Sequence, residues 1–240
     1  MSETITKAYL IYRKDYELFD EIIGFINEYG NIFTTIALGT RKILSKNSRN
    51  LFYGCLSEFS FFASRDIDNK IGKLKKVVLL ENKIDISSRT PLLVINEIIY
   101  KNKIKGEDTF KLLSKLCDTL NQYDYKYDEV IVINLLIKSC KLLGIKINLD
   151  SCSSCESKQI YSFSFEDFGF VCKKHFNQNY KFSSNNIKLI YYAYKCDFKM
   201  ANTFGEIEKK SVTRTFVDFI NLNAGFNSVS YTHLTLPTIA

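Results

Sequence analysis

The chain has 240 residues, of which 46% are hydrophobic and 25% charged, and its formal net charge is +7. This balance is typical of a globular protein and excludes a disordered chain or a collagen. No run of about 18 apolar residues is present, and the first residues lack a secretory-signal pattern. We therefore expect a cytoplasmic protein without a membrane span, built from one large domain or two small ones.

The charge is distributed unevenly along the chain. Residues 1–40 carry three basic and six acidic side chains, whereas residues 41–80 carry nine basic and three acidic ones. Focused positive charge attracts polyanions more strongly than the same charge spread over a surface. The segment after residue 40 is therefore the first candidate for binding a polyanion.

The first 80 residues have the pattern of short strands separated by turns. Strand-like runs cover residues 4–12, 32–38, 51–63 and 71–80. In the third run, Phe59, Phe61 and Ala63 are expected on one face, because they alternate with Glu58 and Ser60. Residues 18–26 fit a helix or a strand equally well. Polar turns are expected at Lys14-Asp15, at 28–31 and at 66–69. Five short strands in a segment of this length predict a small barrel.

The hydrophobic period changes after residue 90, where apolar side chains recur at helical spacing. Residues able to cap a helix are Thr90, Asp108 and Asp128. Gly144 is placed to end the third of these helices. Residues 130–137 of that helix are apolar on nearly every side, so we expect them in the core of a helical bundle. Further helices are expected over residues 187–194 and 211–222.

Three of the seven cysteines form a pattern with a histidine. Two residues separate Cys152 from Cys155 and Cys172 from His175, and residues 161–172 between the pairs are typical of a β-hairpin. Tetrahedral zinc takes four thiolate or imidazole ligands, and pairs with this spacing reach one ion from a tight turn. The pattern therefore predicts a structural zinc site with no catalytic residues, because four protein ligands leave no open position. The alternative is three ordinary thiols and a surface histidine.

Some residues are not assigned to any site. The isolated cysteines, which are expected to be buried in apolar surroundings, are Cys55, Cys117, Cys140 and Cys196. Residues 229–240 contain no Asp, Glu, Lys or Arg, and they resemble translated sequencing-adapter sequence. We therefore interpret residues 228–240 as a non-native tail, in which His233 has no functional role.

Four cations lie in one polar loop between expected strands, namely Arg41, Lys42, Lys46 and Arg49. Loops between the strands of small barrels commonly contact nucleic-acid backbones, where cations neutralise phosphates. The alternative is a solvated charged loop with no partner. We take the loop as the candidate DNA-binding site, and Tyr53 as a weaker candidate for stacking on a base.

Short motifs follow one another in a fixed order between residues 5 and 225. They include Ala8-Tyr9-Leu10, Glu28-Tyr29-Gly30-Asn31-Ile32, Gly39-Thr40-Arg41-Lys42, Leu142-Leu143-Gly144-Ile145 and the cysteine hairpin. This ordered set resembles the bacterial RecO family of DNA repair proteins. The resemblance implies an α+β fold with a five-stranded OB-fold barrel over residues 1–80. It also implies an α-helical domain over 81–227 with a zinc-finger hairpin inserted at 151–176.

The resemblance also implies a function. RecO proteins bind single- and double-stranded DNA, anneal complementary strands and, with RecR, help load RecA onto DNA coated by single-strand-binding protein. By position, the four loop cations would contact DNA backbone, and Cys152, Cys155 and Cys172 would ligate zinc. The family commonly has a fourth cysteine where this chain has His175. Two alternatives stay open, a zinc-dependent nucleic-acid enzyme and a protein-interaction module without DNA contact.

Overall fold

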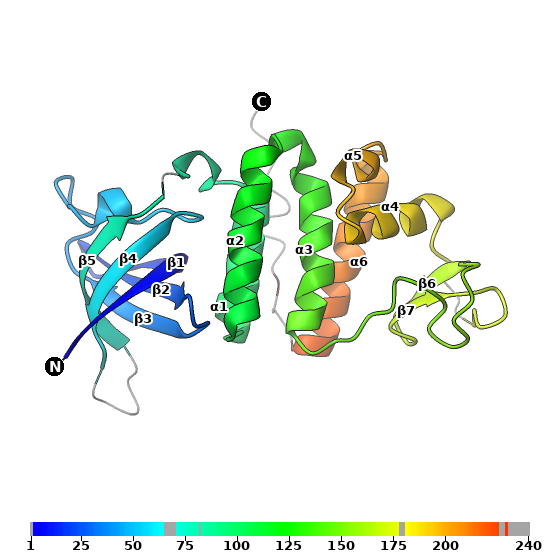
Figure 1. Cartoon of the computed structure of the whole chain (residues 1–240), viewed down its shortest axis with the longest axis horizontal. Helices are drawn as coiled ribbons and strands as arrows, with labels where there is room; N and C mark the ends of the chain where they lie inside the picture. The colour runs from blue at the N-terminus through cyan, green and yellow to red at the C-terminus, as the bar shows by residue number, and fades with distance from the viewer. Residues whose placement is uncertain (1, 65–70, 82, 178–180, 226–228, 230–240) are drawn as a thin grey trace. The chain divides into compact units, whose positions relative to one another are not determined.

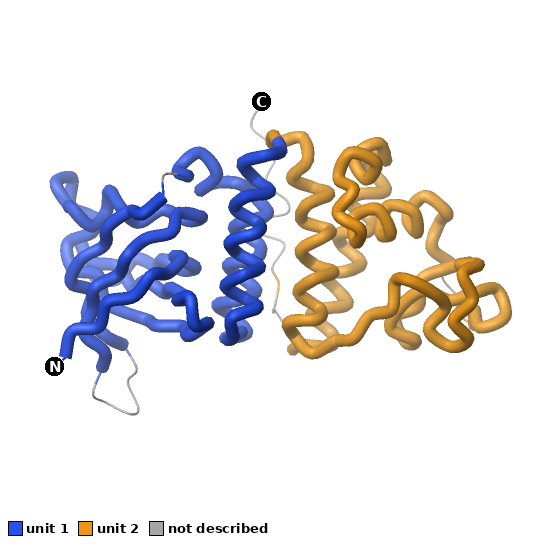
Figure 2. The backbone as a smooth tube through the Cα atoms, viewed as in Figure 1, with its two compact units in different colours: residues 1–123 blue, residues 124–240 orange. Residues whose placement is uncertain are grey.

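The computed structural model describes residues 2–64, 71–81, 83–177, 181–225 and 229. By compactness the chain divides into two units, Met1–Tyr123 and Asp124–Ala240 (Figure 2). The predicted domain boundaries after residues 80 and 227 were drawn from sequence motifs and not from the compactness of the chain. They stay predictions. Among the described residues, no helix combines the length and the apolar character needed to cross a membrane.

A closed barrel forms the beginning of the first unit (Figure 1). Its described strands are β1 (Glu3–Tyr16), β2 (Asp20–Asn27), β3 (Ile32–Ala37), β4 (Leu56–Phe62) and β5 (Ile71–Leu79). Their order around the barrel is β1-β2-β3-β5-β4, and the pairs are antiparallel except for the parallel pair of β3 and β5. This barrel, followed by helices, confirms the predicted α+β fold.

The barrel interior is apolar and aromatic. Phe25 of β2 stacks on Phe59 of β4 with ring centroids 4.3 Å apart, and Phe61 meets Phe25 edge-on at 5.2 Å. All three rings are buried, because alternate residues of a strand point to the same side of the sheet. The prediction that Phe59 and Phe61 share one face of the strand is thus confirmed, and this face points into the barrel. Ala63 is exposed because it follows the end of the strand.

The first strand is longer than its sequence suggested. Lys14 and Asp15, predicted as a turn, pair with β2, and the turn falls at residues 17–19. Glu17 has φ of 54°, in the left-handed region that tight turns use. The prediction was wrong because pairing in the ladder satisfies the backbone groups of both residues, whatever the polarity of their side chains.

Two helices complete the first unit, α1 (Thr90–Asn102) and α2 (Glu107–Gln122). Tyr100 of α1 stacks on Tyr12 of β1 with ring centroids 3.7 Å apart. Gly30, in the turn between β2 and β3, accepts a hydrogen bond of 3.0 Å from the amide of Gly106. A Cβ on Gly30 would lie 2.0 Å from the Gly106 carbonyl carbon, so only glycine allows this contact.

The second unit contains helices and a small hairpin. Its described elements are α3 (Asp128–Leu142), β6 (Ser162–Ser164), β7 (Gly169–Val171), α4 (Ser184–Tyr194), α5 (Phe198–Ala201) and α6 (Glu206–Ala224). Every residue of α3 from Val130 to Ile137 is buried, which confirms the predicted core helix. Short 3₁₀ turns in the chain are η1 (Ser48–Asn50), η2 (Ile84–Ile86) and η3 (Tyr125–Tyr127).

The residues predicted to cap the helices lie in the first helical turn instead of at the N-cap position. The N-cap positions are Arg89, Gly106 and Tyr127. Asp108 and Asp128 therefore lie in the first turn, where a carboxylate interacts favourably with the positive end of the helix dipole. The predicted end of α3 is confirmed. Gly144 has φ of 80°, and the amide of Ile145 donates to the Cys140 carbonyl at 2.8 Å.

Aromatic packing fixes the hairpin strands to the helices of their unit. Phe163 of β6 lies 5.5 Å from Phe216 of α6 and 5.6 Å from Phe182, measured between ring centroids. Phe163 is fully buried. The strands are short, but one face of them belongs to a larger apolar core.

Two sequence predictions fall partly or wholly outside the described residues. These are the turn at 66–69 and, in the tail, residue 228 and residues 230–240. Val229 is described and buried. Its amide donates to Asn221 Oδ1, and its carbonyl accepts from Asn221 Nδ2, both at 2.9 Å.

Candidate functional site

The four predicted metal ligands come together at the base of the hairpin. The Sγ atoms of Cys152, Cys155 and Cys172 and a ring nitrogen of His175 all lie within 4.8 Å of one another. His175 Nδ1 is 3.4 Å from Cys172 Sγ and 3.6 Å from Cys152 Sγ. The Sγ atoms of Cys155 and Cys172 are 3.7 Å apart. In the described part of the chain this is the one such group of ligand atoms.

The distances and the donor types fit a zinc ion. Zn–S bonds of about 2.3 Å and Zn–N bonds of about 2.0 Å place the ligands of a tetrahedral ion roughly 3.5–3.8 Å apart. The three measured separations, 3.4, 3.6 and 3.7 Å, lie close to that range. Three thiols and one imidazole are a common structural zinc set. The cluster could therefore hold a metal.

Each pair of ligands lies in a tight turn. The Cys152 amide donates to the Ser157 carbonyl at 2.8 Å, and the Cys152 carbonyl accepts from the Glu156 amide at 2.9 Å. Glu156 has φ of 59°, which reverses the chain after the first pair. The His175 amide donates to the Cys172 carbonyl at 3.1 Å. The two-residue spacing thus produces the local geometry that it predicted.

Backbone amides in these turns favour the thiolate form of Cys152 and Cys172. Burial would raise the pKa of Cys152, but N–H groups of Cys172 and of its own turn outweigh it and lower the pKa to about 6. Burial likewise opposes the shift at Cys172, where the amides of His175 and Lys174 lower the pKa. Hydrogen bonds to the sulfurs of Cys152 and Cys172 raise the pKa of His175. Thiolates are the form that binds metal.

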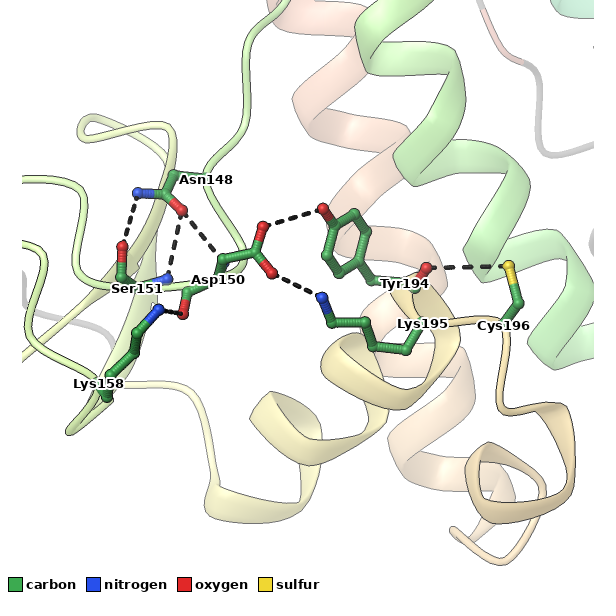
Figure 3. A network of polar contacts seen from close by, with 7 residues as sticks. All are labelled: Asn148, Asp150, Ser151, Lys158, Tyr194, Lys195 and Cys196. Atoms are coloured by element: carbon green, nitrogen blue, oxygen red, sulfur yellow. Dashed lines mark hydrogen bonds and ion pairs between the residues drawn. The ribbon is translucent and has the colours of Figure 1, made fainter.

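A polar network attaches the first cysteine turn to α4 (Figure 3). The Asp150 carboxylate accepts hydrogen bonds from Lys195 Nζ at 2.7 Å and from the Tyr194 hydroxyl at 3.1 Å. The Lys195 ammonium holds the pKa of Asp150 below its usual value. Lys158 Nζ donates to the Asp150 carbonyl at 3.2 Å, and the Asp150 amide donates to Asn148 Oδ1 at 3.1 Å. Because Asp150 lies two residues before Cys152, this network orients the start of the site.

The loop between β3 and β4 carries the predicted cations. All four side chains are exposed, namely Arg41, Lys42, Lys46 and Arg49. The guanidinium of Arg41 pairs with Asp15 at 3.2 Å and donates to the Glu17 carbonyl at 3.4 Å, so its charge is partly neutralised. Lys42 Nζ lies 5.4 Å from the centre of the Phe19 ring. Among the described residues, no carboxylate forms an ion pair with the other three cations.

Two asparagines dock this loop on β5. Asn47 donates to the Lys75 carbonyl at 3.3 Å and accepts from the Val77 amide at 3.1 Å. Asn50 donates to the Val77 carbonyl at 2.9 Å and to the Lys46 carbonyl at 3.3 Å. These bonds hold the part of the loop that carries Lys46 against the backbone of β5. The sequence pattern did not predict these contacts, because asparagine in a polar loop is common.

A bulge in β5 places more cations beside the docked loop. The pairing of β5 with β4 shifts at Lys75, which is the extra residue. Lys73, Lys75 and Lys76 are all exposed. Lys75 pairs with Glu3 at 2.6 Å, whereas Lys73 and Lys76 have no ion pair within the described ranges. The count of basic residues over 41–80 includes these lysines, but the sequence pattern does not place them next to the loop.

A partly buried ion pair holds the two ends of the loop. Arg13 binds both oxygens of Glu21, at 3.0 and 2.9 Å, and its remaining Nη1 donates to the Leu51 carbonyl at 2.8 Å. Burial would raise the pKa of Glu21, but hydrogen bonds from Arg13 and Thr40 lower it. Thr40 lies near the start of the loop and Leu51 near its end. The pair therefore fixes the loop at its base.

The isolated cysteines and Tyr53 belong neither to the metal cluster nor to the cationic loop. Cys55, Cys117 and Cys140 are buried as expected, and burial raises the pKa of Cys117 and of Cys140 to about 12. Cys196 is exposed, contrary to the prediction, because it follows α4 in a left-handed turn with φ of 60°. Tyr53 is half-buried and packs against the barrel core, so only part of its ring is open to a base.

Comparisons with known proteins agree on one family. The family model described as "Recombination protein O C terminal" matches residues 85–225, more than half of the chain. A protein named "DNA repair protein RecO" from Mycoplasma mycoides subsp. mycoides SC is 28% identical over 180 residues, covering 71% of each chain. A protein of the same name from Mycoplasma capricolum subsp. capricolum is 28% identical over 182 residues, again covering 71% of each.

Proposed function

Because this chain belongs to the RecO family and shares its role in DNA repair and recombination, we propose that it is a non-enzymatic recombination mediator. In this proposal it binds single- and double-stranded DNA in the cytoplasm and anneals complementary strands. RecR and single-strand-binding protein are its expected protein partners. With RecR it helps load RecA onto single-stranded DNA.

One observation carries the DNA-binding part of this proposal. Asn47 and Asn50 hold the loop against β5, so the exposed cations of both segments lie on one small barrel. Four of them, Lys46, Arg49, Lys73 and Lys76, have no acidic partner within the described residues. Such cations bind phosphates and release counterions without reading bases. The expected binding is therefore strongly salt-dependent and shows little sequence preference.

The same chemistry supports annealing. Two DNA strands repel each other through their phosphates, and cations that neutralise these charges lower the repulsion. The bases of a strand held by its backbone stay free to pair with a second strand. The helical unit then remains available for protein partners.

The proposed cofactor is one structural zinc ion held by Cys152, Cys155, Cys172 and His175. Four protein donors fill a tetrahedral shell and leave no position for substrate, which favours a structural role over catalysis. The ligand turns around β6 and β7 have a small apolar cluster of their own, so a cross-link through the metal would hold them together.

The experiment is a titration of labelled single- and double-stranded DNA at two salt concentrations. We compare the wild type with Lys46→Glu/Arg49→Glu, and with Lys146→Glu/Lys199→Glu as a control. Both double variants change the net charge equally, and the control lysines are exposed in the second unit. Losing two phosphate contacts should lower the slope of log affinity against log salt for single strands by about 1.4. The control should keep the wild-type slope.

Two results would contradict the proposal. Unchanged DNA affinity in Lys46→Glu/Arg49→Glu would favour a protein-interaction module without DNA contact. Turnover of labelled oligonucleotides by the zinc-loaded wild type would favour a zinc-dependent nucleic-acid enzyme.

A further inference from the structure

Two apolar side chains at the tip of the cationic loop have no role in the barrel. Ile43 is 96% exposed and Leu44 is 82% exposed, and Ile43 has the highest exposed fraction among the large apolar side chains that the structure describes. The Ser45 amide donates to the Lys42 carbonyl at 3.0 Å, so these two residues are the centre of a β-turn. Glycine, asparagine, aspartate, serine and proline are usual there, so turn geometry does not require branched apolar residues.

Hydrogen bonds and an ion pair hold the loop on both sides of the tip. The Arg41 amide donates to the Phe19 carbonyl at 3.0 Å, and the Gly39 amide donates to Asp20 Oδ1 at 2.7 Å. The ion pair of Arg13 with Glu21 and the docking of Asn47 on β5 hold the rest of the loop. Ordering the tip on binding therefore costs less conformational entropy than ordering a free loop would.

The surroundings of the tip are cationic. Residues 38–57 contain four lysines and arginines and no aspartate or glutamate. Lys42 directly precedes the apolar pair, and Lys46 follows it by two residues. A partner that fits this arrangement offers an apolar interior flanked by negative charge. Stacked bases between phosphates have this chemistry, and aliphatic side chains such as isoleucine and leucine insert between base steps in some DNA-binding proteins.

We propose that Ile43 and Leu44 form an apolar wedge that enters between neighbouring bases of bound DNA, while Lys42, Lys46 and Arg49 hold the flanking phosphates. This inference rests on the proposed DNA-binding function. Opening a stack breaks the ordered stacking of the single strand, so its bases can restack in a duplex with a second strand. The wedge thus gives the loop a part in annealing that charge neutralisation alone does not supply.

The test measures base stacking directly. Single-stranded adenine tracts carrying one 2-aminopurine fluoresce weakly while that base is stacked, and emission rises when a neighbour is displaced. Wild-type protein should raise the emission at saturation. Ile43→Ser/Leu44→Ser should bind with about tenfold lower affinity, keep the wild-type salt dependence and leave emission low even when saturated.

A matched control makes the same chemical change elsewhere. Ile207→Ser/Leu222→Ser replaces two exposed apolar residues of α6, which are 84% and 76% exposed. It should behave as the wild type in both measurements. Thermal melting of all variants should coincide, because all four side chains lie at the surface.

Failure of the wedge can be told from failure of DNA binding. If the wild type binds DNA with the expected salt dependence but emission does not change, the wedge is wrong and the proposed function stands. If the wild type binds no DNA, both are wrong. If Ile43→Ser/Leu44→Ser keeps its DNA binding and emission but no longer binds phosphatidylglycerol vesicles that the wild type binds, the tip contacts lipid and the wedge is overturned.

Discussion

The barrel and the cysteine hairpin position their functional groups in opposite ways. In the barrel, buried aromatic residues such as Phe25 and Phe59 form a core, and the candidate DNA-binding residues lie on an exposed loop and one exposed strand. At the base of the hairpin, the local apolar cluster is small and two of its members are the ligands Cys152 and Cys172. The first site lies outside the apolar core of its barrel, whereas the second includes members of its own apolar cluster.

The largest effect on this difference between the two regions is expected from removing a metal ligand. Cys152→Ala should lower the zinc content from roughly one ion per chain to almost none and make the ligand turns sensitive to protease. The strands should keep their packing, because Phe163 is anchored in the helical core. Elemental analysis and limited proteolysis measure both effects.

The matched control is Cys196→Ala, which removes an exposed cysteine outside the cluster and should retain zinc. Equal zinc content in Cys152→Ala and the wild type would show that Cys152 is not needed to hold the metal. The proposed difference between the two regions would then be lost.

A smaller effect is expected from the ion pair at the base of the barrel loop. Arg13→Met leaves the Glu21 carboxylate buried without its partner, which should cost about 2 kcal/mol of unfolding free energy. Denaturant unfolding measures the loss. Lys75→Met removes the more exposed pair with Glu3 and should cost less than about 1 kcal/mol. Equal losses in the two variants would contradict the structural role of Arg13.

The same pair predicts a pH dependence. The pKa of Glu21 is lowered in the folded state from its ordinary value of 4.5. Its contribution to stability is therefore fully present above that pH and is lost as the pH falls through the lowered pKa. Acid unfolding of the wild type should show this loss, and Arg13→Met should lack it.

The smallest effect is expected from His175→Cys. A fourth thiolate preserves a common tetrahedral zinc set, so zinc content should stay the same and unfolding free energy should change by about 0.5 kcal/mol or less. Substitution with Co²⁺ should show stronger thiolate-to-metal absorption in the variant. Loss of the metal in His175→Cys would mean that the turn after Cys172 accepts only an imidazole.

Local patterns made much of this architecture predictable. Alternation in β4 identified Phe59 and Phe61 as inward-facing, and two-residue spacing identified the four members of the metal cluster. Both depend on residues close together in the chain, where geometry follows from bond lengths and turn types. The glycine at the end of α3 was predictable for the same reason.

Contacts between distant segments were not predictable. Asp15 neutralises part of the charge of Arg41, and Asn47 joins the loop to Val77, across long separations in the sequence. The bulge at Lys75 depends on the register between β4 and β5. Such features arise from the closure of the barrel, so a reading of single segments misses them.

The contact between Gly30 and Gly106 bears on how the barrel can be isolated. The Tyr12 ring is covered by Tyr100, and the Tyr9 ring by Phe110, with ring centroids 3.7 and 5.1 Å apart. A polypeptide truncated at residue 80 would expose both tyrosines to solvent and favour self-association. Residues 1–123 are therefore the shorter piece suited to recombinant expression and spectroscopy of the barrel by itself.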